Sequence, residues 1–183
     1  YAWSVPLSYT TGDGRSGLVW IHDEEELELN VSTESWVKFN VNQTGFYLVN
    51  YQKEDWMRFT DLLLTQHEVL SPSDRSNLLF DSFLLAEAGH VPLHLFLSMS
   101  QYLENETHFI PWETAYASFV YLCQMLEATE VNVLLKLEVV HKLRHVYVHF
   151  HENASLIHEV KMESVPQTAY TKPVATWQHV IHP

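Results

Sequence analysis

The sequence predicts an α+β fold in which a partial antiparallel β-sandwich is followed by an α-helical, solenoid-like domain of helix hairpins. Two observations support this prediction. Residues 3–51 alternate between apolar and polar side chains, as half-buried strands do, whereas residues 54–126 carry apolar side chains at helical spacing. Because the strands precede the helices and do not alternate with them, a parallel sheet with helical crossovers is not expected.

The first strands are expected at residues 3–10, 18–22 and 27–31. Pro6 has no amide hydrogen to give to a ladder, so the first strand is expected at a sheet edge or with the proline at its start. Four consecutive acids at 23–26 separate the second and third strands, and we expect a solvated turn there.

The stretch WVKFNVNQTGFYLVNY, residues 36–51, predicts a β-hairpin. Val37, Phe39 and Val41 share one side of its first arm. The other side is polar except for one tryptophan: Trp36, Lys38, Asn40 and Asn42. The alternation resumes after Gly45, because glycine readily takes the positive φ angles that tight hairpin turns need.

Helical periodicity begins at Glu54. The first apolar face consists of Trp56, Phe59, Leu62 and Leu63. The next segment, LSPSDRSNLLFDSFLLAEAG at residues 70–89, has clear end signals, because Ser71 is a good N-cap, Pro72 suits the first helical position and Gly89 suits the C-cap.

Two further helices are expected at 92–102 and from about residue 111. The second carries an apolar stripe made of Ala115, Phe119, Leu122, Cys123 and Leu126, so Cys123 is expected to be a buried thiol. The charged residues of the capped helix, Asp74, Arg75 and Asp81, are expected to form structural ion pairs.

Composition excludes several classes of protein. The chain has 183 residues, 46% of them apolar, and a net charge of −13, which argues against a nucleic-acid partner. No apolar run reaches the roughly 18 residues of a membrane span. The start, Tyr1-Ala2-Trp3, is typical of the middle of a strand and not of a signal peptide, so we expect a fragment of a longer protein.

Four Asn-x-Ser/Thr sequons favour a secretory-pathway location, extracellular or in the endoplasmic reticulum lumen. The expected glycosylation sites are Asn30, Asn105 and Asn153, whereas Asn42 falls at the predicted hairpin turn and is expected to be too hindered. Chance sequons in a cytosolic protein are the alternative.

The sequence contains no complete catalytic motif. A zinc peptidase helix needs His-Glu-x-x-His, but His67-Glu68 and His151-Glu152 are followed by serine where the second histidine should stand. His141, His145 and His149 would line one face of a helix and could chelate a metal ion. The β-forming residues 146–148 argue against that helix, so no catalytic, cofactor or metal residue is assigned, and an incidental histidine cluster is preferred.

Four stretches in order carry a family resemblance: WSVPLSYTT at 3–11, the segment 36–51, Trp56, and the segment 70–89. Together they resemble the membrane M1 zinc aminopeptidases, the group of aminopeptidase N, glutamyl aminopeptidase, laeverin and the endoplasmic reticulum aminopeptidases. The resemblance covers about residues 1–130. Leu48 departs from it, because the family usually has arginine there.

The resemblance implies three regions. Residues 1–52 would be part of the β-sandwich spacer, 53–130 the start of the C-terminal helical domain, and 131–183 a divergent histidine-rich tail. It also implies that the catalytic domain, with its zinc, lies elsewhere in the parent enzyme. The partners it implies are that domain or the intact enzyme, with peptides as the parent's substrates.

Two functions follow as hypotheses. The first is a non-catalytic segment that packs against and caps the catalytic domain of an enzyme removing N-terminal residues from peptides. The second is a truncated isoform that binds or regulates the intact enzyme and has no peptidase activity of its own. An exposed apolar face would favour the second hypothesis.

Overall fold

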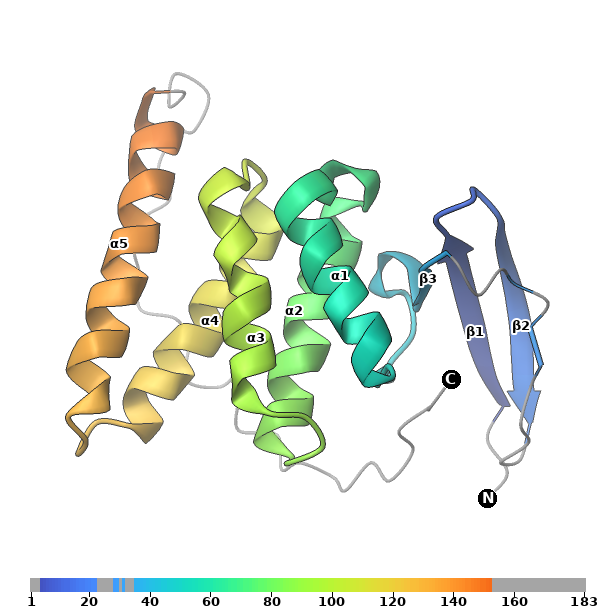
Figure 1. Cartoon of the computed structure of the whole chain (residues 1–183), viewed down its shortest axis with the longest axis horizontal. Coiled ribbons are helices and arrows are strands. Elements are labelled where there is room, and N and C mark those ends of the chain that lie inside the picture. Colours follow the sequence, from blue (N-terminus) through green and yellow to red (C-terminus); the bar gives the residue numbers. More distant parts are fainter. Residues whose placement is uncertain (1–3, 23–27, 30, 32–34, 153–183) are drawn as a thin grey trace.

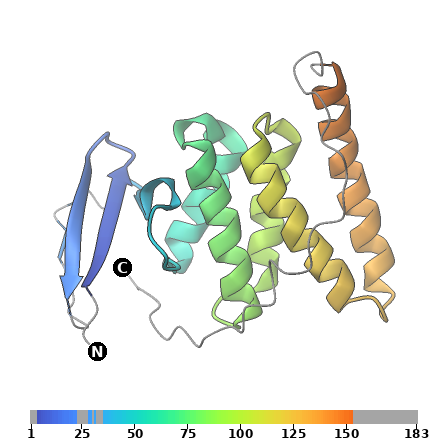
Figure 2. The ribbon, with the colours of Figure 1, turned by 180° about the vertical axis from the view of Figure 1, so that it is seen from behind.

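The structure, a computed structural model, describes residues 4–22, 28–29, 31 and 35–152. Within this described part, three strands come first and the α-helices follow them, which confirms the α+β prediction. Figure 1 shows the sheet at one end of the molecule and the helices standing beside one another in a row that ends with α5. The same order is seen from behind in Figure 2.

The sheet has three antiparallel strands in the order β2-β1-β3: β1 is Ser4–Thr11, β2 is Ser16–His22 and β3 is Val37–Phe39. The central strand is therefore the one that carries Pro6, which contradicts the expected edge position. Proline is tolerated because β3 pairs with β1 only at Tyr9–Thr11. The Pro6 carbonyl accepts a hydrogen bond from the Tyr47 hydroxyl at 3.0 Å, so the backbone groups of Pro6 face away from β2.

The third predicted strand, at 27–31, is not found. Its described residues, Glu28, Leu29 and Val31, lie outside any strand, and residues 23–27 and 30 lie outside the described part of the chain. The described residues form one sheet, so a second sandwich layer stays a prediction.

The predicted hairpin at 36–51 is wrong. β3 ends at Phe39, and a short 3-10 turn, η1 at Val41–Gln43, follows it. Asn40 and Asn42, not Gly45, take left-handed backbone angles, with φ of 56° and 55°. The Phe39 amide donates to the Tyr51 hydroxyl at 3.0 Å, so a side chain takes the place of a ladder partner.

The helices agree closely with prediction near the sheet. α1 is Lys53–Gln66 and buries Trp56, Phe59 and Leu63, and a 3-10 turn, η2 at His67–Val69, follows it. α2 is Pro72–Glu87; the Ser71 hydroxyl accepts the Asp74 amide at 3.1 Å, which confirms the predicted N-cap. Gly89 follows the helix with φ of 79°, as a C-cap glycine should.

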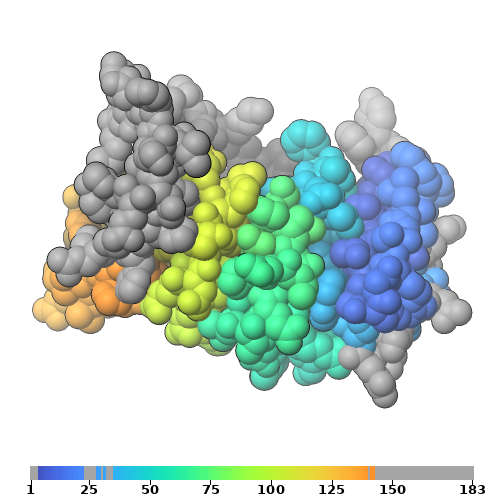
Figure 3. Space-filling model, turned by 90° about the horizontal axis from the view of Figure 1, so that it is seen from above, coloured from blue at the N-terminus to red at the C-terminus, as the bar shows by residue number. Residues whose placement is uncertain are grey.

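The later helices differ more from prediction. The expected helix at 92–102 is divided into α3, Leu93–Met99, and the 3-10 helix η3, Ser100–Asn105. α4 is Phe109–Met125, and Cys123 on it is half-buried instead of fully buried. α2 packs against both α3 and α4. Figure 3 shows this succession from above, from the sheet through the middle helices to α5.

α5 runs from Val131 to Glu152, so the objection that residues 146–148 favour β structure is wrong. Valine and tyrosine disfavour a helix by only about 0.5 kcal/mol each relative to alanine, which the rest of a long helix easily outweighs. In the described part of the chain, no helix has both the length and the apolar character that crossing a membrane requires.

An aromatic group fills the core between the sheet and the helices. The Tyr51 ring lies edge-on to the rings of Trp56 and Phe59, with both centroids at 4.9 Å. All three side chains are at most 5% exposed. The chain between β3 and α1 is therefore fixed against both elements.

Candidate functional site

The described residues offer no place for the zinc that the resemblance implies for the parent enzyme. No group of three histidine, cysteine or acidic side chains suited to a metal ion occurs among them. Of the predicted histidine row, His141 is exposed on α5, while the side chains of His145 and His149 lie outside the described part. The donor set here does not fit a zinc site, so no chemical step is assigned to one.

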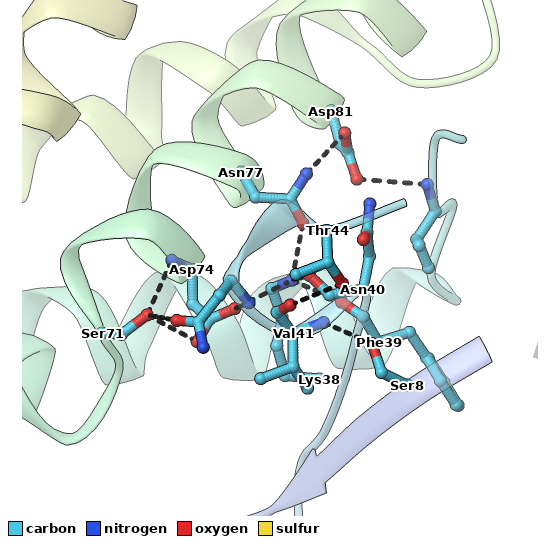
Figure 4. A network of polar contacts seen from close by, with 12 residues as sticks. Ser8, Lys38, Phe39, Asn40, Val41, Thr44, Ser71, Asp74, Asn77 and Asp81 are labelled. Atoms are coloured by element: carbon cyan, nitrogen blue, oxygen red, sulfur yellow. Dashed lines mark hydrogen bonds and ion pairs between the residues drawn. The ribbon is translucent and has the colours of Figure 1, made fainter. Parts of the chain in front are cut away.

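The most unusual site is a buried polar group where the sheet meets α2 (Figure 4). We call it the junction cluster and define it as Lys38, Asp74, Asn77 and Asp81. Lys38 comes from β3, and the other three lie on one face of α2, because their spacing of three and four residues matches the helical turn. Each is at most 3% exposed.

Lys38 is the centre of the junction cluster. Its ammonium donates to Asn77 Oδ1 at 2.6 Å and to the Phe39 carbonyl, and it lies 3.7 Å from Asp74 Oδ1. A fully buried lysine is rare unless it is paired, because removing an ammonium from water is costly. These contacts supply the pairing, and they join β3 to α2.

The two carboxylates of the junction cluster accept hydrogen bonds from backbone amides and not from a second basic side chain. Asp74 Oδ1 accepts the Asn42 amide at 2.7 Å, and Asp81 Oδ2 accepts the Val49 amide at 3.1 Å. Asn77 Nδ2 also donates to Asp81 Oδ1, at 3.0 Å. These bonds explain why residues 40–51 do not form a hairpin: side chains of α2 take amides that a second strand would have used.

Burial governs the electrostatics of the junction cluster. It raises the pKa of Asp81 to about 7, and the nearby ammonium of Lys38 only partly opposes this. Burial likewise lowers the pKa of Lys38 to about 8, against the attraction of Asp74 and Asp81. The cluster therefore holds a carboxyl group and an amine that both titrate near neutral pH.

A second buried ion pair joins α2 to η3 and α4. Arg75 donates through Nε and Nη2 to the two oxygens of Glu106, at 2.7 and 2.9 Å. Glu106 also accepts from the Tyr102 hydroxyl and the His108 amide. Burial alone would raise the pKa of Glu106, but the hydrogen bonds from Arg75 and His108 hold it below its usual value.

The charged residues predicted to pair within α2 are thus paired, but with other elements. Asp74 lies against Lys38 of β3, Arg75 binds Glu106 after η3, and Asp81 binds the Val49 backbone. Lys38 was not predicted as a site residue because alternation placed it on the polar side of a strand. The spacing of Asp74, Asn77 and Asp81, which places three polar side chains on one face of a helix, was the available signal.

The junction cluster has little capacity for chemistry. In the described part of the chain, Asn132 Oδ1 is the single buried side-chain nitrogen or oxygen without a hydrogen-bond partner, and it lies on α5. Every polar group of the junction cluster is already used inside the chain. The arrangement joins two structural layers, and no described group is left free to bind a ligand there.

The sequons are placed unequally. Asn105 is exposed at the end of η3. Asn42 is exposed too, but its Oδ1 accepts from the Ser71 hydroxyl at 2.7 Å and its amide binds Asp74. Asn30 and Asn153 lie outside the described residues.

Comparison with known proteins gives the family. The family model described as the ERAP1-like C-terminal domain matches residues 36–165. Thyrotropin-releasing hormone-degrading ectoenzyme of Rattus norvegicus is 34% identical over 136 residues, which are 71% of this chain and 13% of that protein. Aminopeptidase N of Rattus norvegicus is 35% identical over 133 residues, 72% of this chain and 14% of that protein.

A longer match includes the C-terminal part of the chain. Aminopeptidase N of Homo sapiens is 29% identical over 180 residues, which are 96% of this chain and 18% of that protein. The family match passes residue 130, where the resemblance was expected to stop, and includes α5. The chain thus spans less than a fifth of the length of these relatives.

These matches identify the class of protein: the chain is part of an M1 aminopeptidase. The chain belongs to the family of ERAP1-like C-terminal domains, as the match over residues 36–165 shows.

Proposed function

We propose that this chain acts as a non-catalytic segment of an M1-type zinc aminopeptidase, packing against and capping its catalytic domain. The family match over residues 36–165 carries the proposal, because one matched relative is named aminopeptidase N and another is named as a hormone-degrading ectoenzyme, whereas the chain has no His-Glu-x-x-His motif. The parent activity would be the metal-dependent removal of N-terminal residues from peptides. Residues 1–52 would form part of a β-sandwich spacer, and residues 53–130 would begin the helical cap.

The junction cluster supports a spacer role. A spacer must hold the elements on its two sides in a fixed relation, and Lys38, Asp74 and Asp81 connect the sheet side to α2 through buried, directional contacts. Arg75 and Glu106 continue the connection toward α4. A catalytic domain that docks on such a segment would meet a surface of defined shape.

A segment exchange in rat aminopeptidase N would test the proposal. Its matched 133 residues are replaced by the corresponding residues of this chain. We expect the chimera to fold and to hydrolyse an aminoacyl fluorophore within about tenfold of the parent, because the exchange leaves the parent's own catalytic residues unchanged. The isolated 183-residue chain, assayed in parallel, should show no hydrolysis and no stoichiometric zinc.

Chelator-sensitive turnover by the isolated chain would contradict the non-catalytic role. A chimera that folds but loses activity would contradict the capping role, because the segment would then be specific to another task.

A second candidate function is a truncated partner that binds the intact enzyme. Four apolar side chains on the first half of α5 favour it, because each is between 57% and 67% exposed: Val131, Val133, Leu134 and Leu137. Intact rat aminopeptidase N already contains its own copy of the segment. Its capture by the isolated chain would therefore show a separate binding interaction and support this candidate.

We also propose that the chain is glycosylated in the secretory pathway, at Asn30, Asn105 and Asn153. The name of one relative, an ectoenzyme, and the exposure of Asn105 support this. After secretion from mammalian cells, Asn105→Gln should remove one glycan, seen as a smaller mobility change on endoglycosidase treatment. Asn42→Gln is the matched variant and should remove none, because the Asn42 side chain is engaged by Ser71. An unchanged glycan number in Asn105→Gln would refute the assignment.

A further inference from the structure

We propose that the junction cluster is a proton-operated latch between the sheet and α2, which is closed most tightly when the cluster holds an extra proton and loosens as that proton leaves. Because all of its groups lie inside this chain, the latch is independent of the function proposed above. It would make the stiffness of the connection depend on the pH of the compartment.

The geometry contains an imbalance of charge. Two carboxyl groups, Asp74 and Asp81, face a single ammonium, Lys38, and all three side chains are buried. If both carboxyl groups are ionised, the cluster carries one uncompensated negative charge away from water, which is unfavourable. One bound proton removes this charge.

No other base in the described part of the chain compensates the cluster. The neighbouring ionisable groups outside α2 and β3 are the phenols of Tyr47 and Tyr51, and burial raises the pKa of both, so they stay neutral near pH 7. Arg75, on the same helix, is bound to Glu106 through two hydrogen bonds. The 3-10 turn η1 contributes the amide of Asn42, which has no titratable group.

Asp81 is the group expected to carry the proton. Asp74 lies 3.7 Å from the ammonium, whereas Asp81 bonds to the neutral amides of Val49 and Asn77. The raised pKa of Asp81, about 7, agrees with this assignment. Because the folded chain holds this proton more tightly than the unfolded chain, the stabilising contribution is complete below about pH 4 and is lost as pH rises toward 7.

The amide of Val49 reports directly on the latch, because it donates to Asp81 Oδ2. Hydrogen exchange at this amide is measured by NMR in the unmodified chain, and the rates are corrected for base catalysis. We expect the opening equilibrium at Val49 to rise on the order of 50-fold between pH 5 and pH 7. The carboxyl carbon of Asp81, followed in the same sample, should titrate near neutral pH.

Two variants separate the latch from a general effect of pH. Asp81→Asn keeps the size of the side chain but cannot ionise, so opening near β3 and α2 should no longer depend on pH in this range. Asp61→Asn, at an exposed position on α1, should keep the full dependence.

A Val49 opening equilibrium that stays constant from pH 5 to pH 7, or an Asp81 carbon that titrates below pH 5, would overturn the proposal. Both results come from the unmodified chain, so the test stands even if Asp81→Asn does not fold.

Discussion

Replacing Lys38 with methionine is expected to lower the free energy of unfolding by about 3–5 kcal/mol, since it leaves the buried Asp74 without its base and, above about pH 7, the ionised Asp81 as well. Methionine fills a similar volume, so the loss comes from charge and not from a cavity. The loss should be greater at pH 8 than at pH 5, because Asp81, with a pKa of about 7, is ionised at the higher pH. Urea unfolding followed by tryptophan fluorescence at both pH values measures it.

Lys53→Met is the matched control, because Lys53 is exposed at the start of α1. It should change stability by less than about 0.5 kcal/mol. Adding Asp74→Asn and Asp81→Asn to the Lys38 variant should restore part of the loss, since amide oxygens can still accept from Asn42 and Val49. Equal stability of the Lys38 and Lys53 variants would show that the junction cluster contributes nothing net.

Arg75→Ala is expected to lower the free energy of unfolding by a similar amount, about 3–5 kcal/mol, because it removes the charged partner of the buried Glu106 carboxylate. Glu106 would keep only the Tyr102 hydroxyl and the His108 amide. Glu106 has a lowered pKa in the folded chain, so its pair with Arg75 stabilises above about pH 4.5 and is lost as pH falls. The difference in the free energy of unfolding between Arg75→Ala and the unmodified chain should therefore become smaller in acid.

Arg58→Ala provides the comparison for this variant. Arg58 pairs with Asp55 three residues earlier on α1, and the two side chains are 48% and 33% exposed. Exposed pairs of this kind contribute about 0–1 kcal/mol, so the variant should unfold at a urea concentration close to that of the unmodified chain. If Arg75→Ala costs no more than Arg58→Ala in urea unfolding, the Arg75–Glu106 pair is not a structural anchor.

Features that depend on local signals were predictable from the sequence. Ser71, Pro72 and Gly89 mark the ends of α2 through effects within a few residues, and the structure places all three as expected. The apolar face of α1 follows in the same way from its spacing. These signals need no knowledge of what lies across the molecule.

The hairpin prediction was wrong because the conformation of its second arm depends on contacts with residues more than 30 positions away in the sequence. The sequence alternates between 46 and 51, but the structure buries the consecutive residues Val49, Asn50 and Tyr51. Asp81 takes the Val49 amide, and Asn40 and Asn42 turn the chain at left-handed angles. Alternation reports which side chains face inward and does not say which partner the backbone finds. The burial of Lys38 was hidden for the same reason, since its partners are on α2.

The candidate site was harder to predict than the fold. The sequence offered histidines and sequons as chemical signals, whereas the buried charges occur in a strand and a helix that look ordinary by themselves. Asp74 and Asp81 were expected to form ion pairs on their helix, but nothing near them in the sequence pointed to Lys38 or to the Val49 amide as partners. Their importance depends on burial, which tertiary packing determines.

The hydrogen bonds of the junction cluster cross the point, between residues 52 and 53, at which the sequence suggests dividing the chain. Anyone who expresses the helices alone would leave Asp74 and Asp81 facing solvent, and the sheet alone would lose the only partners of Lys38 on α2. A fragment intended for biophysical work or for transplantation should therefore begin before β1 and continue past Glu106, because Lys38 needs its partners on α2 and Arg75 of α2 needs Glu106.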